Sequence, residues 1–300
     1  MKLKRIVSLC VVFGCLVTGG ANAQSQLDDT LQKIKKYKVI AVGHRESSIP
    51  FSYYAQHQKV VGYAHDIEMK IVDAVKQELK LDKLNVKMMP ITSQNRIALL
   101  QNRTIDFECG STTHNLERQK QANFSNSFFI VGTRLLTRKD SGIQDFPDLK
   151  GKIVVTTAGT TSERILRTMN AKKKMGMSVI SAKDHSDAFL MLETKRAQAW
   201  MMDDVLLAGD RAKAKKPQDF VIVGTPQSYE VYGCMLRKNN PEFKRIMDAT
   251  IAQLQKSGEA EALYKKWFES PIPPLGINLN FPMIDQLRAL FENPNDQVMN

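Results

Sequence analysis

The chain has 300 residues, is 43% hydrophobic and carries a formal net charge of +12. A chain of this length can bury a large core in one large domain or two smaller ones. A basic balance attracts anions, but the sequence has no nucleic-acid-binding motif, and lysine-rich patches such as residues 211–217 are typical of solvated helix ends. We therefore expect no nucleic-acid partner.

The first 23 residues have the pattern of an export signal. Basic residues at positions 2–5 precede an apolar run at 6–17, and the triplet at 21–23 is an A-x-A cleavage site. A bilayer span needs about 20 apolar residues, so this run is too short to be a membrane anchor. We expect cleavage after Ala23. The alternative, a lipid attached to Cys15, fits less well because the residues before it match a lipobox only loosely.

Cleavage at that point leaves two cysteines, Cys109 and Cys234. Two cysteines in an exported protein predict a disulfide, and two buried free thiols are the alternative. The bond would close a loop of more than a hundred residues. Chain-entropy arguments give such a loop about 4–5 kcal/mol of stabilisation.

After a polar lead-in at residues 24–36, short β-branched runs alternate with helical patterns. In the segment 66–80, for example, apolar residues recur at helical spacing. Strands that alternate with helices predict parallel βαβ units and an α/β fold. We expect strands at 38–43, 84–89, 105–108, 151–157, 177–181, 197–202 and 220–224, and further helices at 93–102, from about 161 and after 186.

Two long extended runs, at 128–140 and 230–238, break this alternation. A long run can leave one sheet and enter another, so we expect the chain to cross twice between two lobes. The first lobe would consist of residues 37–130 plus 227–300, and the second of residues 131–226. A disulfide between the two cysteines would then close the first lobe on itself. Two helices follow the second run, and we expect the proline-interrupted segment at 271–282 to lie extended over the surface.

Open α/β sheets bind ligands beyond the carboxyl ends of their strands, so the loops at those ends form the candidate site. Each of these loops carries polar side chains, and a helix N-terminus with free amide groups attracts anions. Simpler structural roles are also open: Ser93 is a candidate N-cap, Ser111 and Thr113 are expected to cap the helix that follows them, and Thr160 with Glu163 forms a capping box. The candidates are Arg45, Ser93, Arg96, Ser111, Thr112, Thr113, Arg118, the turn at 158–163, His185, Asp203 and Asp204.

Three arginines, several hydroxyl groups, a histidine and an acid therefore fall at the same kind of position. Guanidinium groups bind carboxylates through paired, charge-assisted hydrogen bonds. An acid among them provides a partner for a cation. The combination indicates a small ligand with carboxylates and an ammonium group.

At this point a family resemblance becomes specific. The motifs "VGHRESSIPFSYY", "PITSQNR", "DFECGSTTHNLERQKQA", "SAKDHSD", "MMDD" and "YGCMLRK" are similar to those of the periplasmic glutamate/aspartate-binding proteins of ABC importers. The resemblance spans essentially the whole mature chain. It implies the two-lobed type II solute-binding fold, in which two mostly parallel sheets flanked by helices are joined by two hinge crossings. It also implies a periplasmic, monomeric protein that delivers its ligand to the membrane permease subunits.

The resemblance also implies a role for each candidate. Arg118 and Thr113 would hold the α-carboxylate of L-glutamate or L-aspartate, and Ser111 and Asp203 would hold its ammonium group. The family carries a disulfide at the places of Cys109 and Cys234. Around the side-chain carboxylate the resemblance places Arg45, Ser93, Arg96 and His185, with Thr161 contributing from the second lobe.

Charge counting supports an acidic ligand independently of the resemblance. The three arginines and Asp203 sum to +2, and glutamine would leave one buried guanidinium group without its anion, at a cost of roughly 2–5 kcal/mol. We therefore expect at least about thirtyfold selectivity against glutamine. We also expect ligand binding to close the lobes. A protonated His185 would make the affinity rise as the pH falls towards 6.

Two other functions use the same fold. Some secreted dehydratases acting on cyclic amino acids share it, and His185 or Asp203 would then be the general acid or base. A sensor domain that presents amino acids to a membrane receptor would use the same site. The sequence shows no catalytic, cofactor or metal motif, and its other histidines lack metal-ligand spacing. We expect a binding protein with no catalytic residue, no cofactor and no metal.

Overall fold

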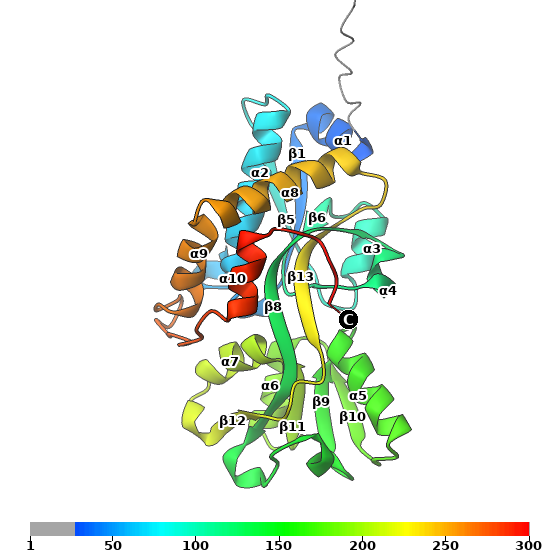
Figure 1. Ribbon diagram of the computed structural model, residues 1–300, viewed down its shortest axis with the longest axis vertical. Coiled ribbons are helices and arrows are strands. Elements are labelled where there is room, and N and C mark those ends of the chain that lie inside the picture. The colour runs from blue at the N-terminus through cyan, green and yellow to red at the C-terminus, as the bar shows by residue number, and fades with distance from the viewer. Residues whose placement is uncertain (1–27, 300) are drawn as a thin grey trace, which may run out of the picture.

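The computed structural model describes residues 28–299 and has two halves stacked along its long axis (Figure 1). In this view the upper half is built from the two ends of the described chain and the lower half from its middle. The predicted export signal, its cleavage site and Cys15 lie outside the described residues. Within residues 28–299, no helix is long and apolar enough to cross a membrane.

The sheet of the upper half begins with three parallel strands in the order β5, β1, β6. Their register places Val42 beside both Met88 and Phe107, so the strands end at the same edge. Helix α2 covers this sheet with a buried face that contains Ile67, Ile71 and Val75, at the spacing expected from the sequence. The bounds are β5 (Asn85–Pro90), β1 (Val39–His44), β6 (Phe107–Glu108) and α2 (Tyr63–Glu78).

The lower half repeats this plan with the parallel strands β10, β9 and β11. Its core packs Leu166 and Met169 of helix α5 against Val154 of β9 and Met201 of β11. Two further helices, α6 and α7, complete this half (Figure 1). The bounds are β10 (Ser178–Ala182), β9 (Ile153–Thr157), β11 (Ala199–Asp203), α5 (Thr161–Lys172), α6 (His185–Glu193) and α7 (Asp204–Ala212).

Two long strands connect the halves. Strand β8 (Asn123–Arg138) pairs with β13 (Tyr229–Leu236) in the upper half and with β11 and β12 (Phe220–Val223) in the lower half. The predicted lobe boundaries lie in or beside these strands, and the boundaries themselves stay a prediction. All these pairings of β8 are antiparallel. The expectation of a parallel βαβ unit is therefore wrong for β12, whereas the α/β class with mostly parallel sheets is confirmed.

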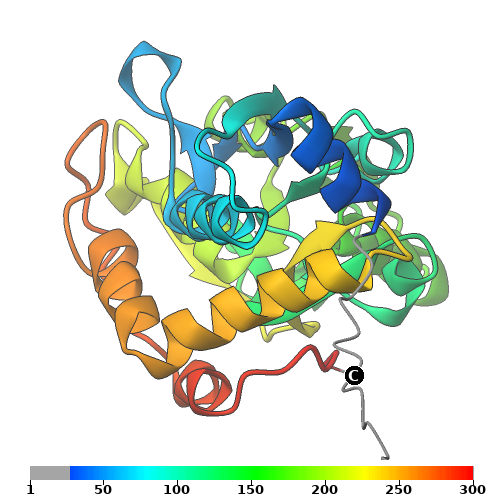
Figure 2. The ribbon, with the colours of Figure 1, turned by 90° about the horizontal axis from the view of Figure 1, so that it is seen from above.

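The remaining elements cover the upper half. In Figure 2, α8 and α9 meet at a corner and α10 lies beside that corner. A small antiparallel sheet of β2, β3 and β4, which the sequence did not predict, follows β1. The bounds are α1 (Asp29–Tyr37), β2 (Ser47–Ser48), β3 (Ser52–Tyr54), β4 (Val60–Val61), α3 (Arg96–Gln101), β7 (Thr113–His114), α4 (Leu116–Gln119), α8 (Pro241–Lys256), α9 (Glu259–Phe268) and α10 (Asp285–Glu292), with short 3-10 helices at Gln56–Gln58, Lys139–Ser141, Phe146–Leu149 and Pro217–Asp219.

The predicted disulfide is confirmed. Cys109 and Cys234 are bonded, with 4.2 Å between their Cα atoms and 125 positions between them in the sequence. Cys109 follows β6 and Cys234 lies in β13, so the bond joins the end of β6 to its neighbouring strand, which returns from the lower half. It closes the upper half on itself, as expected.

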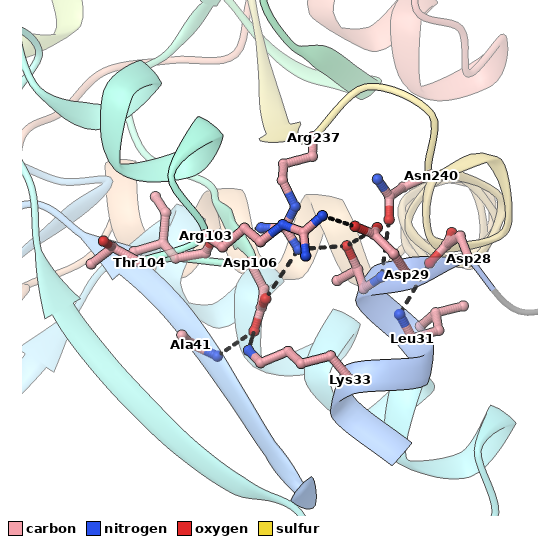
Figure 3. A network of polar contacts seen from close by, with 12 residues as sticks. Asp28, Asp29, Leu31, Lys33, Ala41, Arg103, Thr104, Asp106, Arg237 and Asn240 are labelled. Carbon is pink, nitrogen blue, oxygen red and sulfur yellow. Dashed lines mark hydrogen bonds and ion pairs between the residues drawn. The ribbon is translucent and has the colours of Figure 1, made fainter. Parts of the chain in front are cut away.

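A polar network ties the ends of the upper half together (Figure 3). The buried carboxylate of Asp106 accepts hydrogen bonds from Lys33 on α1 (2.5 Å) and from the backbone N–H of Ala41 (2.8 Å). Arg237, which follows β13, lies 3.4 Å from the same carboxylate and donates to the Thr30 hydroxyl group (2.7 Å). The network holds the N-terminal helix, the first strand and the returning strand in one rigid unit, away from the candidate site.

Candidate functional site

Three buried arginines of the upper half lie at its border with the lower half. Arg45 directly follows β1, Arg96 begins α3 after β5, and Arg118 lies in α4. Only 1%, 1% and 8% of their respective surfaces are exposed. The backbone N–H of Arg45 donates to Ser52 of the small sheet (3.0 Å), which fixes the loop that carries it. The structure thus brings together the three arginines that the sequence places after separate strands.

Ser111 links two of these guanidinium groups through its hydroxyl group and its carbonyl oxygen. Arg45 Nη1 donates to Ser111 Oγ (3.3 Å), and Arg96 Nη1 donates to the Ser111 carbonyl oxygen (3.2 Å). Arg96 Nη1 also donates to the hydroxyl group of Thr112. Ser111 Oγ in turn donates to Ser48 (3.2 Å). Neutral groups therefore accept these hydrogen bonds from both cations, and an anion would be a stronger acceptor.

Arg118 reaches across to the lower half. Its Nη1 donates to the Thr113 carbonyl oxygen (2.8 Å), and its Nη2 donates to the carbonyl oxygen of Gly159 in the lower half (3.2 Å). Burial, followed by the nearby charge of Arg96, lowers the pKa of Arg118 to about 9. The same two causes lower the pKa of Arg45 to about 10. Both groups remain charged at neutral pH, but the repulsion of each by Arg96 makes an anionic ligand favourable.

The expected helix caps are partly wrong. The residue that caps α4 is Asn115, whose side chain accepts from the Arg118 backbone N–H (2.9 Å), so Ser111 and Thr113 do not cap it. At α3 the N-cap position belongs to Asn95 rather than to Ser93. Both errors have the same cause, because each helix begins two or three residues later than the sequence pattern indicated.

The turn before α5 differs from a capping box by one position. Thr160 caps the helix as expected, accepting from the Glu163 N–H (3.1 Å). The Glu163 carboxylate, however, accepts from the N–H of Gly159 (2.8 Å) instead of from the N-cap residue. This arrangement places Thr161, the first residue of α5, in the border between the halves, where its hydroxyl group lies 3.5 Å from that of Thr113.

His185, the first residue of α6, faces Arg45 across the border. Its Nε2 lies 3.5 Å from Arg45 Nη2, and its Nδ1 lies 2.9 Å from the Thr157 hydroxyl group. A guanidinium group only donates, so Nε2 must accept and Nδ1 carries the proton. Burial, then the charges of Arg45 and Arg96, lower the pKa of His185 well below 6.5. The structure therefore favours a neutral ring, whereas the expectation of a protonated histidine concerned the ligand-bound protein.

Asp203 ends β11 and supplies the carboxylate of the lower half. One of its oxygens accepts from Ser162 (3.4 Å) and the other from the hydroxyl group of Tyr232 on β13. Burial raises the pKa of Asp203 well above 3.8, and the neighbouring carboxylate of Glu230 raises it further. A cation placed beside Asp203 would therefore stabilise its buried negative charge.

Two carboxylates of this cluster were missed in the sequence. Glu230 on β13 accepts from the hydroxyl groups of Thr113 (2.6 Å) and Thr161 (2.7 Å), one from each half. Glu108 at the end of β6 accepts from Thr112 (2.5 Å). With all six groups ionised, these two acids and Asp203 carry three negative charges, which balance the three arginines. The net charge of +2 inferred from the sequence is therefore wrong. The sequence feature that pointed to Glu230 was its position as the first residue of the long extended run at 230–238.

The nine predicted ligand residues gather in one place. All are buried, and they come from both halves. Ser93 joins the cluster through its backbone, since its carbonyl oxygen lies against Gly159. The arrangement offers guanidinium donors for two carboxylates and acidic acceptors for an ammonium group. Within residues 28–299 there is no group of three or more His, Cys, Asp or Glu residues that could hold a metal ion.

Comparisons with known proteins agree on the family. The model of the family "Bacterial extracellular solute-binding proteins, family 3" matches residues 40–270. A glutamate/aspartate import solute-binding protein from Salmonella typhimurium is 60% identical over 303 aligned positions, covering 100% of both chains. A protein of the same name from Escherichia coli K12 is 62% identical over 271 positions, covering 90% of each chain.

Among solved structures, an ancestral arginine-binding protein bound to arginine has the same fold. It superposes with a TM-score of 0.69 at 28% sequence identity, covering 77% of this chain and 98% of that one. The type II solute-binding fold expected from the sequence is thus confirmed, and neighbours with this fold bind amino acids of different charge.

Proposed function

The chain belongs to family 3 of the bacterial extracellular solute-binding proteins, and on that premise we propose that it captures L-glutamate or L-aspartate for an ABC importer. The observation that carries the proposal is the meeting of three buried arginines from the upper half with Asp203 and His185 from the lower half. The names of the Salmonella typhimurium and Escherichia coli relatives support the same ligands.

The proposed roles are those that the family resemblance implies, and the contacts of the residues support them. Arg118 binds the α-carboxylate, with Thr113 as a secondary contact because its hydroxyl hydrogen already goes to Glu230. Asp203 binds the ammonium group, and Ser111 assists through the lone pair left after it accepts from Arg45.

Arg45 and Arg96 bind the side-chain carboxylate of the ligand. In the structure both donate their hydrogen bonds to neutral groups. The neutral His185 accepts from Arg45 and so orients its guanidinium group. The resemblance assigns Ser93 and Thr161 to this carboxylate as well, although Ser93 lies beside Gly159 and Thr161 beside Thr113, at the Arg118 end of the site.

Binding and closure are one process in this proposal. The protein groups that bind the ligand lie on both halves, so one ligand can contact all of them only when the halves are together. Shifting a population from mostly open to mostly closed requires about 5 kcal/mol of differential binding. Several charge-assisted hydrogen bonds, each contributing about 1.5–3 kcal/mol, supply that amount.

The proposal extends to location and partners. The N-terminal pattern and the family's extracellular character support export to the periplasm, with cleavage after Ala23. The closed monomer would deliver its ligand to the membrane permease subunits. We assign no catalysis to the site, so incubation with acidic or cyclic amino acids is expected to give no product.

Calorimetry on the mature chain tests the ligand class. L-Glutamate and L-aspartate should bind at least about thirtyfold more tightly than L-glutamine, because a neutral side chain leaves a buried guanidinium group without an anion. Arg118→Ala should abolish the binding of every amino acid, whereas Arg45→Met should mainly reduce the preference for acidic side chains. The exposed Arg288→Ala, in α10, is the control. Equal affinities for glutamate and glutamine in the native protein would contradict the proposal.

A further inference from the structure

The backbones of the two halves come unusually close at two glycines. A Cβ atom added to Gly209 in α7 would lie 3.0 Å from the carbonyl carbon of Ile49 and closer still to its oxygen. A Cβ atom added to Gly159 would lie 2.6 Å from the Cα atom of Gln94. Non-bonded carbon atoms prefer about 3.5–4.0 Å. At both places the obstacle is backbone, which cannot rotate away as a side chain can.

Both contacts border the arginine cluster. Gly159 supplies the carbonyl oxygen that accepts from Arg118. Ile49 follows Ser48, which accepts from Ser111. Gly209 lies within α7, and Gly159 lies shortly before α5. The two helices are at opposite sides of the lower half, near its border with the upper half (Figure 1). The contacts therefore flank the site on two sides.

We infer that Gly209 and Gly159 determine how far the two halves can close, and that the absence of a side chain at both positions is required for a ligand to contact both halves at once. This inference rests on the proposed function. Neither glycine contacts the ligand itself in that proposal. They act as positioning residues that allow Arg118, Asp203 and their neighbours to approach the same small molecule.

Gly209 provides the cleaner test because it lies within a helix. Alanine is the better helix former, so Gly209→Ala should not destabilise the open protein. It should clash with Ile49 only when the halves close. Gly132→Ala is the matched control, since the nearest atom to a Cβ atom added there is 3.4 Å away, an ordinary contact.

The experiment measures L-glutamate affinity by calorimetry and the melting temperature without ligand. Gly209→Ala should weaken binding about tenfold or more, as an overpacked contact does, with a melting temperature at or above that of the native protein. Gly132→Ala should bind within about threefold of the native protein. Native-like affinity of Gly209→Ala would overturn the inference. A lowered melting temperature without ligand would also overturn it, because the Ile49 contact would then persist in the ligand-free protein.

Gly159 gives an independent comparison. Its φ of +75° strains any other residue in either state, so its control must carry the same strain. Gly176 has a φ of +64° and nothing within 4 Å of an added Cβ atom. Both alanine variants should lose some stability, but only Gly159→Ala should lose about tenfold or more in affinity.

Equal affinities of the two alanine variants would overturn the role of Gly159. A native protein that gives no heat with glutamate or aspartate would instead overturn the proposed function, together with the inference that rests on it.

Discussion

At the scale of single residues, the buried Asp203 determines how binding responds to pH. Burial and the nearby Glu230 raise its pKa, while the hydrogen bond from Tyr232 opposes that rise. In the closed arrangement the carboxyl group of Asp203 therefore binds a proton more tightly than an exposed aspartate does. An ammonium group can pair with it only after that proton has left. His185 adds no opposing effect, because its own pKa is lowered and the ring stays neutral.

We therefore predict that the affinity for L-glutamate falls as the pH is lowered from 8 to 5.5. The loss approaches about tenfold per pH unit once the pH is below the pKa of Asp203, since each bound ligand then displaces one proton. Calorimetry across this range, repeated in buffers of different ionisation enthalpy, measures both the affinity and the proton released. An affinity that rises towards acid would show that a protonated His185, not Asp203, dominates.

At the scale of elements, the disulfide holds the upper half closed around both crossings. Cys109 precedes β8, and Cys234 lies within β13, so the loop of 125 positions encloses the whole lower half. The bond limits the freedom of the unfolded chain most strongly when the loop is this long. The lower half has a hydrophobic core of its own, centred on residues such as Val154 and Leu166.

Replacing both cysteines by alanine is expected to lower the free energy of unfolding by about 4 kcal/mol. Denaturant unfolding of the native and the double variant, each with and without a reducing agent, measures the difference. The reducing agent should leave the double variant unchanged. A loss below about 1 kcal/mol would mean that the unfolded chain gains little freedom from the missing bond.

Much of the fold was predictable because its buried strands are short β-branched runs between amphipathic helices. The small sheet of β2, β3 and β4 was not, since its strands of two or three residues are too short to show a period. The direction of β8 also escaped prediction. A long extended run shows that the chain crosses between sheets, but its pairing depends on partners distant in sequence, such as Gly132 with Tyr229.

The site was predictable to the extent that its residues follow strands. Arg45 and Asp203 come directly after or at the end of parallel strands, which is where ligands bind in such sheets. Glu230 lies near the start of a crossing strand, with its carboxylate directed to Thr113 and Thr161. Only the folded arrangement brings it there, because those two threonines belong to different halves. The neutral state of His185 likewise depends on contacts across the border.

At the scale of the whole molecule, the closed arrangement is costly without a ligand. It brings three guanidinium groups together away from water, and the lowered pKa of Arg45 and of Arg118 reflects that cost. An acidic amino acid gives the guanidinium groups carboxylate acceptors in place of neutral ones and gives Asp203 a cationic partner. We therefore expect the ligand-free protein in solution to populate an open form, in which the contacts of Arg118 with Gly159 and of Arg45 with His185 are absent.

Small-angle X-ray scattering of the mature protein tests this central claim most directly. The radius of gyration should decrease when L-glutamate is added at a concentration that just saturates the protein, and should decrease much less with the same concentration of L-glutamine. A radius of gyration that L-glutamate leaves unchanged, or that L-glutamine reduces equally, would contradict closure of the two halves around an acidic amino acid.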